Sequence, residues 1–66
     1  MDMSTLDQKL TEATLQYIKT FGKKDQFKVW VEKVDSEEKY VVHCSYHDTW
    51  LGKSTTFEYS KTIKED

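Results

Sequence analysis

Residues 39–49, KYVVHCSYHDT, alternate between two sets of side chains with a period of two. One side of an extended chain would carry a mainly apolar set, namely Tyr40, Val42, Cys44 and Tyr46. The opposite side would carry a more polar set, namely Val41, His43, Ser45 and His47. Because successive side chains of a strand point to opposite faces, this alternation predicts a β-strand with one buried face. The remaining segments can be arranged around it.

Residues 26–34 and 54–63 show the same alternation, so each predicts a further strand. We place turns at Ser36-Glu37 and at Leu51-Gly52, and we pair the strands antiparallel. The apolar residues then meet on one face, with Phe27, Val29 and Val31 opposite Tyr46, Cys44 and Val42, and with Phe57 and Tyr59 opposite Tyr46 and Cys44. A shift of one residue would scatter this set over both faces. The pattern therefore predicts a three-stranded antiparallel meander in the order 1-2-3.

The segment of about residues 5–21 has the 3.6-residue period of an amphipathic helix. Its apolar stripe consists of Met3, Leu6, Leu10, Ala13, Tyr17 and Phe21. We expect Gly22 to end the helix in a left-handed conformation. The sequence thus predicts an α+β fold, αβββ, in which residues 1–66 form one small domain and the helix covers the apolar face of the sheet.

Composition limits the classes of function. All ten basic residues are lysine, against twelve acidic residues, and the net charge is −2. Arginine supplies the planar fork that grips phosphates and guanines, so an acidic chain without arginine disfavours a nucleic-acid partner. A single cysteine, Cys44, excludes an internal disulfide and suits a reducing compartment. No apolar run has the length needed to cross a bilayer. We therefore expect a cytoplasmic protein with no membrane partner.

The polar side of the predicted sheet carries a tryptophan at its centre. On this register Trp30 lies opposite His43, Ser60 lies beyond His43, and Val41 is a neighbour. Indole rings frequently anchor protein interfaces, which makes Trp30, Val41 and His43 a candidate docking face. The alternative is an indole that lies across its own sheet in cross-strand pairs. The sequence leaves both interpretations open.

Three further features bear on partners. Trp50 and Leu51 fall at the second turn, where we expect them to fold back over the core; the alternative is a protruding anchor. His47, opposite Thr56, lies beside this region and is included in the candidate partner-binding set. Strand 3 is an edge with few charged residues, which permits a homodimer or capture of a partner strand.

Signals for chemistry are weak. His43 and His47 would have Cα atoms about 13 Å apart on a strand, too far to share an ion. Cys44 would point to the other face, and buried cysteine behaves as a small hydrophobe. The run Gly52-Lys53-Ser54-Thr55 resembles the end of a phosphate-binding loop but has His47 where that loop needs glycine. We expect no catalytic residue, metal or cofactor.

The sequence therefore favours a small non-enzymatic protein-binding module, such as a regulator or inhibitor, that docks through exposed aromatics or a sheet edge. The element order, followed by residues 60–64, superficially resembles a double-stranded-RNA-binding domain, in which a lysine-rich second helix follows the third strand. That resemblance implies RNA binding as the alternative, although the glycine run and consecutive lysines of that family are missing. A minimal enzyme using His43 or His47 is a second alternative.

Overall fold

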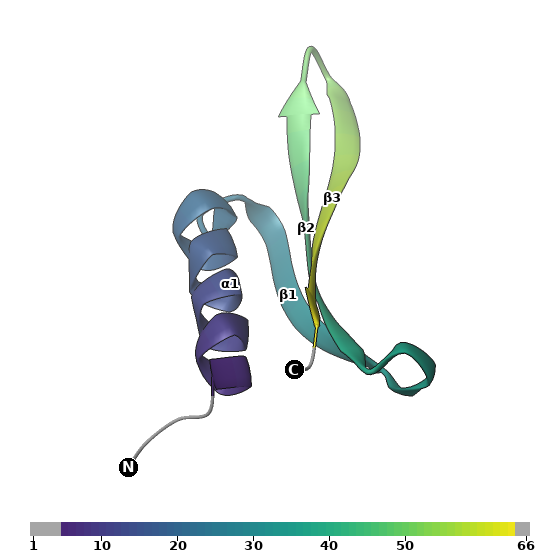
Figure 1. Ribbon diagram of the computed structural model, residues 1–66. Helices are drawn as coiled ribbons and strands as arrows, with labels where there is room; N and C mark the ends of the chain where they lie inside the picture. The colour runs from purple at the N-terminus through teal and green to yellow at the C-terminus, as the bar shows by residue number, and fades with distance from the viewer. Residues whose placement is uncertain (1–4, 65–66) are drawn as a thin grey trace.

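One helix packs against one face of a three-stranded antiparallel sheet (Figure 1). The computed structural model describes residues 5–64. The elements are α1 (Thr5–Phe21), β1 (Asp25–Val34), a short 3₁₀ turn η1 (Asp35–Glu37), β2 (Lys39–Trp50) and β3 (Lys53–Lys64). The sheet order is β1-β2-β3. The predicted αβββ fold is confirmed; Met3, assigned to the helix stripe, lies outside the described residues.

The strand register follows the predicted turns. Val34 pairs with Lys39 across the first turn, and Trp50 pairs with Lys53 across the second. One prediction was wrong, because Phe27 is not directly opposite Tyr46. Between the pairs 25↔47 and 28↔45, β1 has two residues where β2 has one, which makes a β-bulge. Gln26 occupies the left-handed region there, with φ of 54°.

The core lies where the helix meets the middle of the sheet. Ala13 is the buried residue of α1, and its small side chain lets the helix approach β2 and β3 closely. It packs with the fully or almost fully buried Val42 and Ile63. The partly buried side chains that surround this cluster are Leu6, Leu10, Tyr17 and Val29. The predicted apolar stripe of the helix is therefore the surface that packs on the sheet.

The helix is too short to cover the whole sheet. Seventeen residues of α1 span about 26 Å, whereas twelve residues of β2 or of β3 span about 40 Å. Strand β1 pairs no further along β2 than His47. Residues 48–55 therefore form a two-stranded projection, called the arm below, which extends beyond the helix and β1 (Figure 1).

One other expectation was wrong, the one for Gly22. Gly22 does not adopt a left-handed conformation, since Gly52 is the glycine with positive φ. Its amide instead donates to the Ile18 carbonyl at 2.7 Å, and a Cβ added to Gly22 would clash with that oxygen. Glycine is required at this position because a side chain would come too close to the Ile18 carbonyl, not because the backbone has a positive φ. Residues 60–64 continue β3 and do not begin a helix of the double-stranded-RNA-binding kind.

Within residues 5–64, the structure shows no helix that has both the length and the apolar character needed to cross a membrane.

Candidate functional site

The arm ends in a two-residue turn made by Leu51 and Gly52. Their φ angles are 53° and 79°, so both lie in the left-handed region. Two successive residues of positive φ between a closing pair, Trp50 and Lys53, are the hallmark of a type I′ hairpin turn. The first position of that turn favours Asn, Asp or Gly, because other side chains are strained there. A leucine at this position is therefore unusual.

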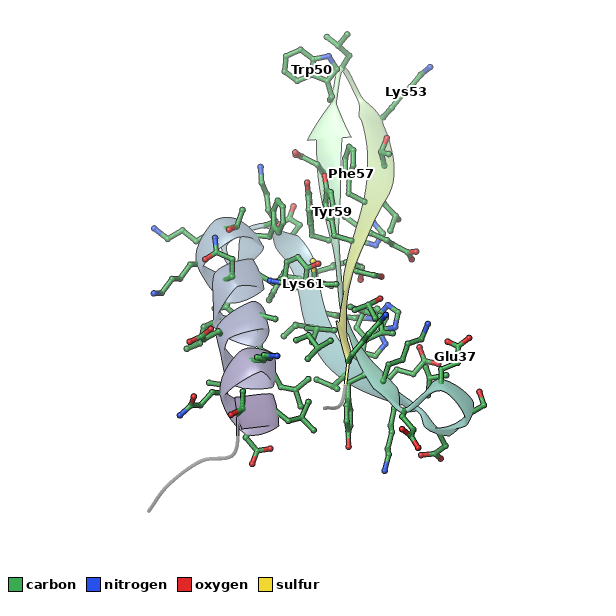
Figure 2. All side chains as sticks on the ribbon, in the orientation of Figure 1. Glu37, Trp50, Lys53, Phe57, Tyr59 and Lys61 are labelled. Carbon is green, nitrogen blue, oxygen red and sulfur yellow. The ribbon has the colours of Figure 1, made fainter. Side chains whose placement is uncertain are left out.

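Trp50 and Leu51 protrude from the end of the arm. Their exposed fractions are 77% and 87%, so the expectation that they fold back over the core was wrong. Figure 2 shows Trp50 at the far end of the molecule from the helix N-terminus, beyond the end of α1. The physical reason is the length of the arm, which carries its tip past every surface that could cover it.

Aromatic rings cluster where the arm joins the body. Phe21, at the end of α1, stacks on Tyr46 and Tyr59 with ring centroids 4.8 and 5.0 Å away. Tyr46 in turn stacks on Phe57 at 5.3 Å. Tyr46 is buried, but Phe57 and Tyr59 remain 38% and 43% exposed because the helix ends at Phe21 and covers them only in part. The aromatic surface therefore continues from the core onto the base of the arm (Figure 2).

Burial of this cluster alters the chemistry of Tyr46. Desolvation of its hydroxyl, followed by its hydrogen bond with Tyr59, raises the pKa of Tyr46 above the usual value. The Lys24 ammonium lies 5.9 Å from the centroid of the Tyr46 ring and 3.4 Å from a carboxylate oxygen of Asp48. These contacts link the loop after α1 to the base of the arm.

The open face of the sheet carries the predicted Trp30–His43 pair. The two rings stack with centroids 5.3 Å apart and planes 20° from parallel, and Trp30 is 45% exposed. Val41 is half-buried and diagonal to Trp30, because Trp30 pairs with His43 and Glu32 pairs with Val41. The indole therefore both lies across its own sheet and presents apolar surface to solvent.

His43 is bracketed by two polar side chains on the same face. Its Nε2 lies 2.9 Å from Glu32 Oε1, and its Nδ1 lies 2.8 Å from Ser60 Oγ. An ionised carboxylate can only accept, so Nε2 donates to Glu32 and, in the neutral ring, Nδ1 accepts from the Ser60 hydroxyl. The three strands are thus cross-linked by a chain of side-chain hydrogen bonds that holds His43 against Trp30.

This chain of carboxylate, imidazole and hydroxyl contains the group types used in acyl transfer. Here it lies on an open sheet face, and the groove described below is on the helix side of the sheet. His47 is separate, with its Nδ1 3.4 Å from Thr56 Oγ1. Cys44 is fully buried on the helix side, and burial raises the pKa of its thiol. Among residues 5–64, no group of three or more His, Cys, Asp and Glu side chains is placed to hold a metal ion.

A groove of about 700 Å³ runs between α1 and β3 on the helix side. Its lining residues are Lys9, Glu12, Ala13, Gln16, Tyr17, Lys61, Thr62, Ile63 and Lys64. Four consecutive residues of β3 contribute, although their side chains alternate between faces. The backbone edge of β3 is therefore one wall of the groove, and the helix is the other. Figure 2 shows Lys61 between the two.

The structure does not bring all the predicted site residues together. His43 and Trp50 are seven positions apart on β2, or about 23 Å along the strand. Trp30, Val41 and His43 form one surface on the open face, whereas Trp50 and Leu51 form another at the tip. Sequence reasoning missed the exposure of Phe57 and Tyr59 and the contact of Glu32 with His43. A comparison of the helix length with the strand lengths would have predicted the exposure of the two aromatic residues. Considering diagonal neighbours on the open face would have predicted the contact of Glu32 with His43.

The chain matches no protein-family model, no curated protein and no solved structure. Its function is therefore inferred from its own residues and geometry.

Proposed function

We propose that this protein is a small protein-binding module, acting as a regulator or inhibitor, whose principal contact is the Trp50–Leu51 tip of the arm. The observation that carries the proposal is the leucine in the first position of the type I′ turn. That position costs backbone strain for leucine, and its side chain is 87% exposed, so it gains no packing within the chain. A partner surface supplies the missing contact.

The neighbouring indole adds the energy that such a contact needs. An aromatic side chain buries about 150–250 Å² in an interface, worth roughly 4 kcal/mol before the costs of association. Trp50 is 77% exposed and sits on a two-stranded projection that can enter a cavity in a partner. Tryptophan is among the residue types that are enriched at interface hot spots, and here it is exposed beside an exposed leucine.

The open face supplies a second contact in this proposal. Trp30 with Val41 and His43 forms an apolar surface fixed by the Glu32–His43–Ser60 hydrogen bonds. A fixed side chain loses little conformational entropy when it binds, which favours its use in an interface. His47 lies on the same face nearer the arm, so it extends this surface toward the arm.

The experiment compares partner capture by matched variants of the full chain. Affinity purification from the source cell, with mass spectrometry, identifies proteins retained by the wild type. We expect Trp50→Ala and Leu51→Asn to lose these proteins and Trp30→Ala to retain them in reduced amount. Leu15→Ala is the control, because Leu15 is an exposed leucine on the far side of the helix. Unchanged retention by both tip variants would refute the proposed contact.

A further inference from the structure

We infer that the groove between α1 and β3 binds an extended acidic segment of a partner protein, which pairs with β3 as a fourth strand of the sheet. The inference extends the proposed role as a protein-binding module to a second site and rests on that role. Three observations support it: the unpaired edge of β3, the helix that flanks this edge, and the positive charge around them.

The first observation is the state of the β3 edge. Within residues 5–64, strand β3 pairs with β2 alone, so it is an edge of the sheet that these residues form. Its twelve residues pair with β2 without any shift of register, from Lys53 to Lys64. The opposite edge, β1, is interrupted by the bulge at Gln26. A long regular edge has a row of backbone donors and acceptors that another extended chain can satisfy.

The second observation is the shape of the space beside this edge. The groove of about 700 Å³ has the β3 backbone as one wall and α1 as the other. A volume of this size falls in the range of about 300–1,000 Å³ that is usual for ligand sites. An added strand would lie about 4.8 Å from β3, beside the groove that α1 and β3 line. Ala13 and Ile63 provide an apolar floor for alternate side chains of the bound segment.

The third observation is charge. Three lysines and one glutamate line the groove, namely Lys9, Lys61, Lys64 and Glu12, which gives +3 − 1 = +2. The whole chain has a net charge of −2, whereas the charges of the residues that line the groove sum to +2. Opposite charges across adjacent strands are favourable, and like charges are unfavourable. The matching segment therefore alternates acidic residues with small aliphatic residues.

The same charges argue against a second copy of this chain as the occupant. The charged residues of β3 are Lys53, Lys61, Lys64 and Glu58, so the strand carries +3 − 1 = +2. Pairing β3 with the β3 of a second copy brings two positively charged strands together. A homodimer through strand 3, which the sequence permits, is therefore the competing outcome of the test.

The test uses the full chain and three fluorescent peptides with blocked ends. The first alternates glutamate and valine, the second alternates lysine and valine, and the third is the acidic peptide with alternate backbone amides methylated. Fluorescence anisotropy measures binding at low and at physiological salt. Hydrogen exchange locates the amides that the peptide protects. Sedimentation of the chain alone, over a range of concentrations, measures its oligomeric state.

We expect the acidic peptide to bind, to weaken with added salt, and to protect β3 amides. Neither the lysine peptide nor the methylated peptide should bind comparably. Lys61→Glu and Lys64→Glu together should weaken binding by about tenfold or more, since each reversal replaces an attraction with a repulsion. Lys64→Glu alone, at the exposed end of β3, tests the same charge if the double variant does not fold. Lys28→Glu, on the opposite edge, is the matched control and should bind as the wild type does.

Three results would overturn the inference: no binding of the acidic peptide, equal binding of the methylated peptide, or a dimer in solution that occupies the β3 edge. Its failure can be separated from failure of the proposed function. If no peptide binds but Trp50→Ala still loses partner proteins, the groove inference alone is wrong. If the acidic peptide binds but Trp50→Ala and Leu51→Asn retain every partner protein, the tip proposal alone is wrong.

Discussion

Leu51 and Gly52 adopt the same left-handed backbone conformation, with φ of 53° and 79°, yet just one of them is a residue suited to it. Glycine accepts this conformation without strain, whereas leucine pays a steric cost of about 1–2 kcal/mol. The exposed leucine side chain recovers none of this cost within the chain. The stability of the isolated protein therefore favours a residue other than leucine at position 51.

We predict that Leu51→Asn stabilises the folded protein by about 0.5–1 kcal/mol, because asparagine suits the first position of a type I′ turn. Urea unfolding followed by circular dichroism measures this change. Leu15→Asn is the control, since it places asparagine in the middle of α1, where its helix propensity is lower than that of leucine. The control should lower the midpoint. A lower midpoint for Leu51→Asn as well would contradict the account of the turn.

The arm should open more readily than the body of the sheet. Residues 48–55 pair with one another alone and lie beyond the helix, whereas residues 40–46 of β2 lie between two strands. Local opening costs least where few buried apolar contacts are lost. We predict that hydrogen exchange at the hydrogen-bonded amides of the arm is faster than in the middle of β2 by about tenfold or more. Similar exchange rates in both regions would contradict the prediction that the arm opens more readily than the body of the sheet.

Cys44 should react with thiol reagents only when the domain opens. The side chain is fully buried, and burial raises the pKa of the thiol, which lowers the fraction present as the reactive thiolate. We predict labelling at least about a hundredfold slower in the native protein than in urea, because opening costs a few kcal/mol. Mass spectrometry of the alkylated chain measures the rate, with Cys44→Ser as the blank. Equal rates in the two conditions would refute the burial.

Alkaline pH should destabilise the fold through Tyr46. Its folded-state pKa is raised above the usual 10.0, chiefly by desolvation. The unfolded chain therefore releases the proton first, so the stability from this group is complete below pH about 10 and is lost as the pH rises further. Urea midpoints across this range measure the loss. We expect Tyr46→Phe to lose less stability than the wild type above pH about 10; an identical decline would exclude Tyr46 as its source.

Gly22→Ala should be more damaging than an ordinary substitution at a helix end. The added methyl would clash with the Ile18 carbonyl oxygen, which is backbone and cannot rotate away. We predict a loss of about 1–3 kcal/mol, the range for overpacking in a fixed environment. Thermal unfolding provides the measurement. Lys23→Ala, at the next position, is the control and should change stability little.

Periodicity was sufficient to predict the strands, their order and almost all of their pairing. It worked because a one-residue slip moves every side chain of a strand to the other face, as the agreement of Val31 with Val42 and of Tyr46 with Phe57 illustrates. The bulge at Gln26 could not be read in this way. The inserted residue changes the alternation of apolar and polar side chains over two positions at the end of the strand. That stretch is too short for the sequence pattern to reveal the bulge.

The exposure of the tip was predicted wrongly because hydrophobicity indicates which residues gain from burial, not whether a surface can reach them. Trp50 and Leu51 lie past the end of a helix that is about 14 Å shorter than the strands it packs against. The exposed edges of Phe57 and Tyr59 have the same cause. The contact of Glu32 with His43 was missed because Glu32 was paired with Val41, the residue directly opposite it. A glutamate side chain is long enough to reach the diagonal neighbour His43 as well.

The bulge at Gln26 has a consequence for any partner that contacts both tryptophans. Past this point the sheet narrows from three strands to two, and a two-stranded ribbon coils more strongly than a broader sheet. Strand alternation also places Trp50, seven positions from His43 on β2, on the sheet face opposite that of Trp30. A flat partner can cover one indole or the other; a partner that covers both has to wrap around the edge of the ribbon.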